Sequence, residues 1–184
     1  MIYIKKVNAK VISNRIADYN RFMDSIKKYP KAQQIKKVNL YLNQLLPQYD
    51  SVIEKKNDYW ATPKEFLIRG FGDCEDYVII KYYSLLKLGF DEKKLFITVV
   101  KVKNSRGNHM VLSYFKEHGR SPLILDNLSF RMLPLNKRID LEVKLLINST
   151  GVYKLTKTDT LIKIANSFKK YQLLMKRMEN ERCS

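Results

Sequence analysis

One short run constrains this chain more than any other: Gly70-Phe71-Gly72-Asp73-Cys74-Glu75-Asp76-Tyr77. Two glycines interrupt the chain, and residues 77–88 then place apolar side chains at helical spacing. Cys74 is therefore expected where a loop becomes a helix. Backbone N–H groups and the helix dipole at such a position lower the pKa of a thiol and favour the nucleophilic thiolate.

Three carboxylates beside this cysteine have the opposite effect. Asp73, Glu75 and Asp76 each raise the pKa of the thiol by like-charge repulsion. A thiolate here needs a cation nearby, either a histidine or a bound metal ion, and the chain has two histidines, His109 and His118. The acids also have a purely structural interpretation, with Asp73 as the helix N-cap and the other two complementing the helix dipole.

Composition bounds the class of protein. With 184 residues, 45% of them hydrophobic, the chain can bury one core, and we expect a single domain over residues 1–184. Its two cysteines, Cys74 and Cys183, provide no disulfide framework. The N-terminal residues lack the apolar run and cleavage site of a signal peptide, which predicts a cytoplasmic protein if the chain is full length.

The net charge of +17 raises the question of nucleic-acid binding. The lysines, however, are scattered along the chain as pairs, and no block of five basic residues occurs. We therefore expect solvated basic surfaces and no nucleic-acid partner.

The order of elements predicts an α+β fold. Helical spacing predicts helices over residues 11–28, 32–46, 63–68 and 77–88, and a final helix capped by Asp159 or Thr160. Strand patterns cover residues 95–102, 109–115, 122–126, 141–148 and 152–155, the first three as an antiparallel meander. The expected lobes are mainly helical (1–90), β-sheet (91–157) and a C-terminal helix (158–184).

Two residues of the predicted sheet are candidate partners of Cys74. His109 begins one strand and Asp126 ends its neighbour, so the two side chains can face each other across an antiparallel ladder. Asp126 would then hold one imidazole nitrogen while the other meets the thiol, as a Cys-His-Asp triad requires. The alternative is that the three residues have no catalytic role: a surface histidine, a turn-forming aspartate and a small buried cysteine.

The residues around Cys74 resemble the bacterial transglutaminase-like cysteine proteinases. The similarity is carried by residues 58–67 (DYWATPKEFL) and 72–77 (GDCEDY), with further similar stretches at 37–39, 81–82, 88–89, 109–112, 122–128 and 138–141 and at Asn148. It spans about residues 35 to 155. So long a run around a nucleophile is more specific than a three-residue motif.

The resemblance implies a papain-like or transglutaminase-like core, in which the helix headed by the cysteine packs on the antiparallel sheet. It makes Cys74 the nucleophile, His109 the base and Asp126 the orienting carboxylate of a cysteine endopeptidase. The Cys74 backbone N–H would serve the oxyanion hole. Trp60 is either a second donor there or a packing residue, and we expect packing.

The resemblance also implies a setting. Proteases of this family act in the periplasm on large calcium-binding adhesins exported by type I secretion, cut near paired alanines and thereby control biofilm attachment. A cyclic-di-GMP receptor of the inner membrane sequesters them. They bind calcium beside the active site, and Asp73 and Glu75, with Asp76 as a helper, are the matching residues here.

Two other functions remain open on sequence grounds. The same triad could transfer an acyl group to an amine, as a transglutaminase does. Alternatively, the domain could be non-catalytic and bind only calcium or a partner protein.

Overall fold

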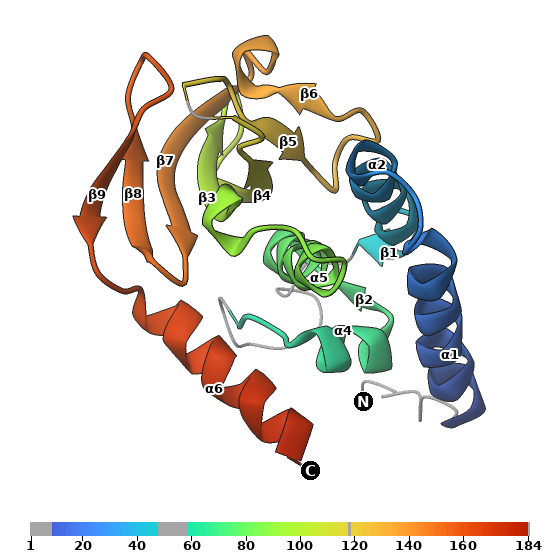
Figure 1. The fold of residues 1–184 in the computed structure, drawn as a ribbon. Coiled ribbons are helices and arrows are strands. Elements are labelled where there is room, and N and C mark those ends of the chain that lie inside the picture. Colours follow the sequence, from blue (N-terminus) through green and yellow to red (C-terminus); the bar gives the residue numbers. More distant parts are fainter. Residues whose placement is uncertain (1–8, 48–58, 118, 184) are drawn as a thin grey trace.

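The computed structural model describes residues 9–47, 59–117 and 119–183. Helices gather on one side of the molecule and strands on the other, with the last helix beneath the sheet (Figure 1). The α-helices of the described residues are α1 (Ala9–Ile26), α2 (Lys31–Leu42), α4 (Pro63–Arg69), α5 (Cys74–Lys87) and α6 (Lys169–Cys183). This arrangement confirms the predicted α+β class.

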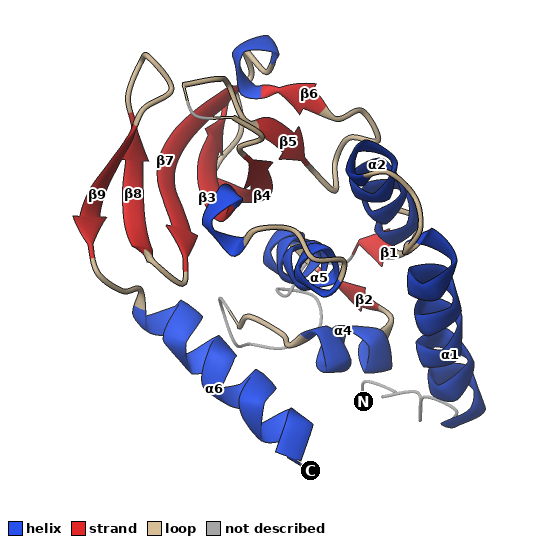
Figure 2. Ribbon diagram, viewed as in Figure 1, coloured by secondary structure: helices blue, strands red, loops and turns tan. Residues whose placement is uncertain are grey.

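Seven strands form one antiparallel sheet in the order β6-β5-β4-β3-β7-β8-β9 (Figure 2). Their bounds are β3 (Leu95–Val102), β4 (Asn108–Tyr114), β5 (Leu123–Leu125), β6 (Leu133–Pro134), β7 (Leu141–Asn148), β8 (Gly151–Leu155) and β9 (Leu161–Ala165). A separate parallel pair joins β1 (Leu46–Pro47) to β2 (Phe71–Gly72). Two 3-10 turns, η1 (Glu92–Lys94) and η2 (Leu135–Lys137), precede β3 and follow β6.

Helix α5 is the centre of the core. It runs between the sheet and the α1–α2 pair (Figure 1) and contacts β4, β3, α2 and α4. Its buried positions surround the helix, which is the pattern of a helix covered on every side. These are Asp76, Tyr77, Val78, Ile79, Ile80, Lys81, Tyr82, Ser84 and Leu85. Each large apolar side chain so buried contributes about 1.5–3 kcal/mol, so packing fixes where this helix begins and points.

All five predicted strands are present in the structure. The predicted strands 95–102 and 141–148 coincide with β3 and β7. The predicted three-strand meander is confirmed by β3, β4 and β5. The chain then adds β6, which was not predicted, and returns to the other edge of β3, where β7 pairs with it. The pattern of a single strand does not specify its neighbours, so the pairing of β7 with β3 could not be predicted from the sequence.

Two helix predictions are wrong at their ends. Helix α2 ends at Leu42 rather than at residue 46, because Asn43 is its C-cap and the chain then enters β1. The C-terminal helix does not begin near Thr160. Residues 161–165 form strand β9, and α6 begins at Lys169.

The wrong start of the last helix has a local cause. Asp159 adopts a left-handed φ of 57° in a tight turn, and the N–H of Thr156 donates to the Thr160 carbonyl. This turn joins β8 to β9 as a hairpin, so Asp159 is a turn residue and not an N-cap. The β-branched Ile162 and Ile164 suit the strand that follows.

The entry to α5 depends on two glycines. Gly70 caps α4 with a φ of 80°, the left-handed conformation that glycine adopts without strain. Gly72 has another reason: a Cβ added there would lie 2.7 Å from the Cβ of Asp76 and 3.0 Å from the Phe66 ring. The absence of a side chain at position 72 therefore lets the first turn of α5 pack against the preceding chain.

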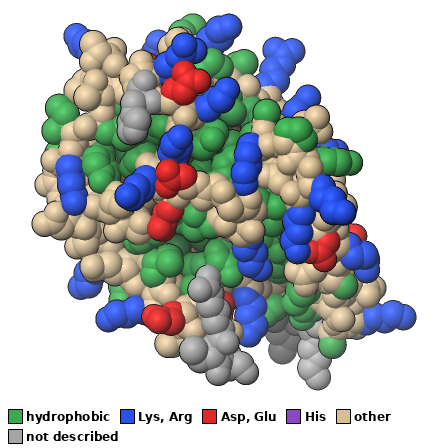
Figure 3. Space-filling view, viewed as in Figure 1, with side chains coloured by type: hydrophobic (Ala, Val, Ile, Leu, Met, Phe, Trp, Pro, Cys, Tyr) green, Lys and Arg blue, Asp and Glu red, His purple; other side chains and the backbone are tan. Residues whose placement is uncertain are grey.

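No helix among the described residues is long and apolar enough to cross a bilayer. On the face shown in Figure 3, lysine and arginine side chains are spread among polar and apolar ones and form no single continuous patch.

We expect Gly72→Ala to lower the free energy of unfolding by about 1–3 kcal/mol, because the added methyl group displaces Asp76 and the start of α5. Urea denaturation followed by circular dichroism measures this. Ser105→Ala, a change in an exposed turn, serves as the control and should leave stability unchanged. Equal stability of both variants would contradict the packing argument.

Candidate active site

Cys74 is the first residue of α5, as the sequence predicts. Asp73 occupies the N-cap position, but its side chain makes no capping hydrogen bond. The cysteine is partly buried and not in a disulfide. Its position at the helix start therefore comes from the glycine-containing entry and the buried body of α5.

The surroundings of the Cys74 thiol favour its protonated form. Cys74 donates a hydrogen bond to Glu75 Oε2 at 3.1 Å. Burial raises the pKa of the thiol strongly, and the charge of Glu75 and its hydrogen bond raise it further, against a smaller lowering by the Met110 backbone N–H. Met110 follows His109 on β4, so the sulfur lies beside the strand position next to the imidazole.

His109 and Asp126 form a buried pair. Nε2 of His109 lies 2.8 Å from Oδ1 of Asp126, and their side chains are only 10% and 1% exposed. The structure thus brings the two predicted side chains together. Because Asp126 takes Nε2, the nitrogen left for a thiol is Nδ1. The predicted approach of Nδ1 to the sulfur stays a prediction.

Asp126 is held from several directions. The N–H of Leu128 donates to Oδ1 at 2.9 Å, and Nη2 of Arg138 donates to Oδ2 at 3.0 Å. Burial alone would raise the pKa of this carboxyl, but the hydrogen bonds from His109, Leu128 and Arg138 outweigh burial and lower the pKa to about 2. Asp126 is thus an ionised, oriented acceptor at neutral pH.

Sequence reasoning missed Asn43. Its amide donates to the backbone carbonyls of Asp126 at 2.8 Å and of Ser129 at 3.1 Å, which fixes the loop after β5 to the end of α2. The sequence offered no signal for this contact, because Asn43 and Asp126 are 83 residues apart in the chain. Arg138 stood out only through the family resemblance.

Lys81 was also singled out only by resemblance, and its environment is unusual. It is fully buried on α5, and Nζ has no hydrogen-bond partner among the described residues. Burial lowers the pKa of this ammonium to about 7, against the opposing attraction of Asp126. The site thus contains a buried cation whose charge Asp126 partly offsets.

The three acidic residues around Cys74 are not equivalent. Asp76 is buried, and its Oδ1 accepts a hydrogen bond from the Ala61 N–H at 2.8 Å, which ties it to the chain before α4. Glu75 accepts the hydrogen bond from the Cys74 thiol. Within residues 9–47, 59–117 and 119–183, no cluster of three histidine, cysteine or acidic side chains is preformed for a metal. Carboxylate oxygens of Asp73 and Glu75 still suit a hard cation such as Ca²⁺, which completes its shell with carbonyls and water.

Trp60 packs in the core near the last helix. Its side chain is 5% exposed, and its ring lies 5.8 Å from that of Phe168. The indole N–H is buried and makes no hydrogen bond to any described residue. The contacts fit the packing role that the sequence favoured. His118 lies outside the described residues.

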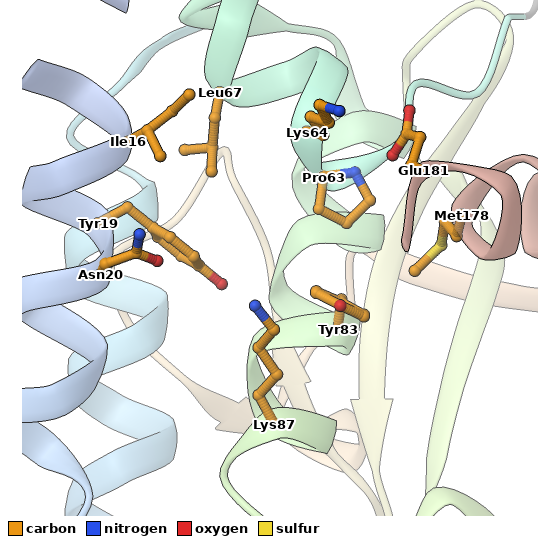
Figure 4. Close-up of a pocket in the computed structure, with 10 residues that line it drawn as sticks. All are labelled: Ile16, Tyr19, Asn20, Pro63, Lys64, Leu67, Tyr83, Lys87, Met178 and Glu181. Carbon is orange, nitrogen blue, oxygen red and sulfur yellow. The ribbon is translucent and has the colours of Figure 1, made fainter. Parts of the chain in front are cut away.

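A pocket lies between α1, α4, α5 and α6 (Figure 4). It is lined by Ile16, Tyr19, Asn20, Pro63, Lys64, Leu67, Tyr83, Lys87, Met178 and Glu181. None of Cys74, His109 and Asp126 lines it, so this pocket is not where the candidate triad would act.

A sequence model of the bacterial transglutaminase-like cysteine proteinases matches residues 14–139. The chain belongs to this family. It is therefore a cysteine protease with a transglutaminase-like α+β core, in agreement with the sequence prediction. A search of curated protein sequences gave no match.

Solved structures of LapG from Legionella pneumophila share the fold of this protease. The calcium-bound structure superposes with a TM-score of 0.82 at 35% identity, covering 91% of each chain. The EGTA-treated structure gives 0.81 at 35% identity, covering 91% of this chain and 89% of LapG. A third LapG structure gives 0.79 at 36% identity, with coverages of 91% and 88%.

The buried ammonium leads to a prediction about stability. Lys81→Met should raise the free energy of unfolding by about 1–3 kcal/mol at pH 6, because an apolar chain replaces a buried, poorly paired charge. The folded state loses this proton near pH 7, the unfolded state only near its ordinary value of about 10.4. The free energy of unfolding of the wild type therefore rises with pH between these two values. The stability advantage of Lys81→Met should accordingly be smaller at about pH 9 than at pH 6.

Urea titrations at about pH 6 and 9 measure this difference. Lys87→Met, which removes an exposed lysine from the same helix, is the control and should show no such pH dependence. A Lys81→Met protein less stable than wild type at the lower pH would show that the ammonium is well paired.

Proposed function

We propose that this protein is an endopeptidase whose nucleophile is Cys74, whose base is His109 and whose orienting carboxylate is Asp126. The observation that carries the proposal is the buried 2.8 Å pair of His109 Nε2 and Asp126 Oδ1, next to the strand position that the Cys74 thiol contacts. Membership of a cysteine protease family supports it.

The proposed chemistry follows from these contacts. Nδ1 of His109 takes the thiol proton, and the sulfur attacks a peptide carbonyl. The imidazolium that forms is stabilised by Asp126 through Nε2. It then gives its proton to the leaving amine, and water hydrolyses the thioester to a carboxylate and free thiol. The Cys74 backbone N–H at the start of α5 is the proposed oxyanion donor, and Trp60 is proposed to pack rather than to donate.

We propose calcium as the cofactor, with Asp73 and Glu75 as ligands and Asp76 in a supporting role. The support is the donor chemistry around Cys74 and the existence of LapG structures described as calcium-bound and EGTA-treated. When bound, the cation would neutralise carboxylates that otherwise favour the protonated thiol. Glu75 would then exchange its hydrogen bond with the thiol for a metal contact.

The substrate and setting are proposed from the family. A protease implies a protein substrate, and we propose a large calcium-binding adhesin of the cell surface, cut in the periplasm to control biofilm attachment. The proposed regulatory partner is an inner-membrane receptor for cyclic-di-GMP.

We expect Cys74→Ala to abolish cleavage of an adhesin fragment that contains paired alanines, because no other group replaces the thiolate. Cys183→Ala is the matched control and should cleave at the wild-type rate. Electrophoresis and mass spectrometry of the products are the readouts, and unchanged melting temperatures show that both variants fold. Full activity of Cys74→Ala would refute the assignment. Products that gain the mass of an added amine would instead indicate acyl transfer.

Calcium should raise the reactivity of Cys74. We expect iodoacetamide to alkylate Cys74 at least about tenfold faster with calcium than with EGTA, because removing one repulsive charge changes the thiol pKa by about one unit or more. Peptide mass spectrometry separates Cys74 from Cys183, whose rate is the internal control. A Glu75→Gln variant should be fast in both buffers. Equal rates for the wild type in both buffers would exclude calcium as the neutralising group.

A further inference from the structure

Arg138 is the centre of a three-residue ion network that ends on Asp126. Its Nε and Nη2 contact Oδ1 and Oδ2 of Asp140 at 2.9 and 2.8 Å, as a two-point fork. The same Nη2 donates to Oδ2 of Asp126 at 3.0 Å. The sequence showed only that residues 138–141 resemble the family, and it gave them no role.

The geometry explains why Asp126 presents one particular oxygen to His109. The planar guanidinium is fixed by its fork with Asp140, so the second hydrogen of Nη2 points in one direction. That hydrogen occupies Oδ2 of Asp126. Oδ1 is then the oxygen that receives His109 Nε2 and the Leu128 N–H. Rotation of the buried carboxylate would break all three hydrogen bonds at once.

The network also sets the charge that His109 experiences. Asp126 and Arg138 alone form a neutral pair, which would stabilise an imidazolium weakly. Asp140 shares the same guanidinium and gives the three residues one net negative charge. This charge offsets that of the buried Lys81 near Asp126 when the amine is protonated. Asp140 thereby keeps His109 from facing a net positive environment when the histidine takes a thiol proton.

We propose that Arg138 and Asp140 are positioning residues of the reaction, which hold the Asp126 carboxylate in the orientation and charge state that His109 requires. The inference rests on the proposed function, since it assigns a purpose to the His109–Asp126 pair. Arg138 acts through Asp126, and Asp140 acts through Arg138.

The position of Asp140 separates this role from a structural one. Its side chain is 45% exposed, and Ile139 beside it is 78% exposed, so the segment lies at the surface. Arg138 is 12% exposed, so the loss of the fork costs some stability, but the fork lies at the surface end of the network and not in the apolar core. A change at Asp140 should therefore leave the protein folded, with at most a small drop in melting temperature, while it alters the reactivity of Cys74.

The experiment uses the full chain in calcium-containing buffer, with iodoacetamide as the probe and mass spectrometry to follow Cys74. We expect Asp140→Asn to slow alkylation of Cys74 roughly three- to tenfold and Arg138→Met at least about tenfold, as the loss of a charged hydrogen bond implies. Glu142→Gln is the matched control. It neutralises an exposed carboxylate of a neighbouring ion pair, with Lys144, and should react at the wild-type rate.

Two further readouts would not respond to a merely structural role. The chain has two histidines, so ¹⁵N-histidine spectra can resolve the ring nitrogens of His109. We expect Asp140→Asn, but not Glu142→Gln, to shift the resonance of Nε2. In a protein that already carries Asp126→Asn, Arg138→Met should add no further slowing, because residues that act in series are not additive.

The outcomes distinguish the inference from the proposed function. If wild-type Cys74 reacts no faster than in a His109→Asn variant, the triad fails and the inference fails with it. If His109→Asn is slow while folded Asp140→Asn and Arg138→Met react like the wild type, only the inference is overturned. If Arg138→Met does not fold, Asp140→Asn decides alone. A wild-type rate and an unchanged Nε2 resonance in that variant overturn the inference.

Discussion

The carboxylate of Asp126 is the charge around which the candidate site is arranged. A carboxylate that is 1% exposed is costly unless its oxygens are satisfied by donors. Here the donors come from separate parts of the chain: His109 on β4, the Leu128 backbone and Arg138 before β7. Asn43 at the end of α2 holds the Asp126 carbonyl, and the Lys81 ammonium on α5 adds an electrostatic attraction. Satisfying one buried charge thus connects helices α2 and α5 with the sheet.

Helix α5 supplies the other half of the site, and packing rather than chemistry places it. Its apolar residues are buried against the sheet on one side and against α2 on the other, so its first residue has little freedom. Cys74 is held beside β4 in this way. The protonation state of the sulfur, in contrast, depends strongly on the neighbouring residue. Glu75 accepts a hydrogen bond from the thiol, and its charge repels a thiolate. In the proposed mechanism, calcium and the nucleophile therefore compete for the same carboxylate.

Much of the fold was predictable because burial leaves a local trace in the sequence. The β-branched strand 95–102, the strand over 141–148 and the helix headed by Cys74 were found from residue patterns alone. The errors occur where a local pattern has two solutions. Residues 161–165 contain apolar side chains that fit a helix or a strand, and pairing with β8 selected the strand. Residues 43–46 were expected to continue a helix, but Asn43 ends it and binds the loop after Asp126.

The sequence by itself determined that a cysteine begins a buried helix after a glycine-containing turn, that the fold is α+β, and that the chain resembles a protease family. It also indicated His109 and Asp126 as partners. Only the tertiary structure decided which imidazole nitrogen meets Asp126, which residues orient that carboxylate, and that Lys81 lies buried near it. Helical and strand spacing act over a few residues, whereas the contacts around Asp126 join residues 12 to 83 positions apart, and only the folded chain brings such residues together.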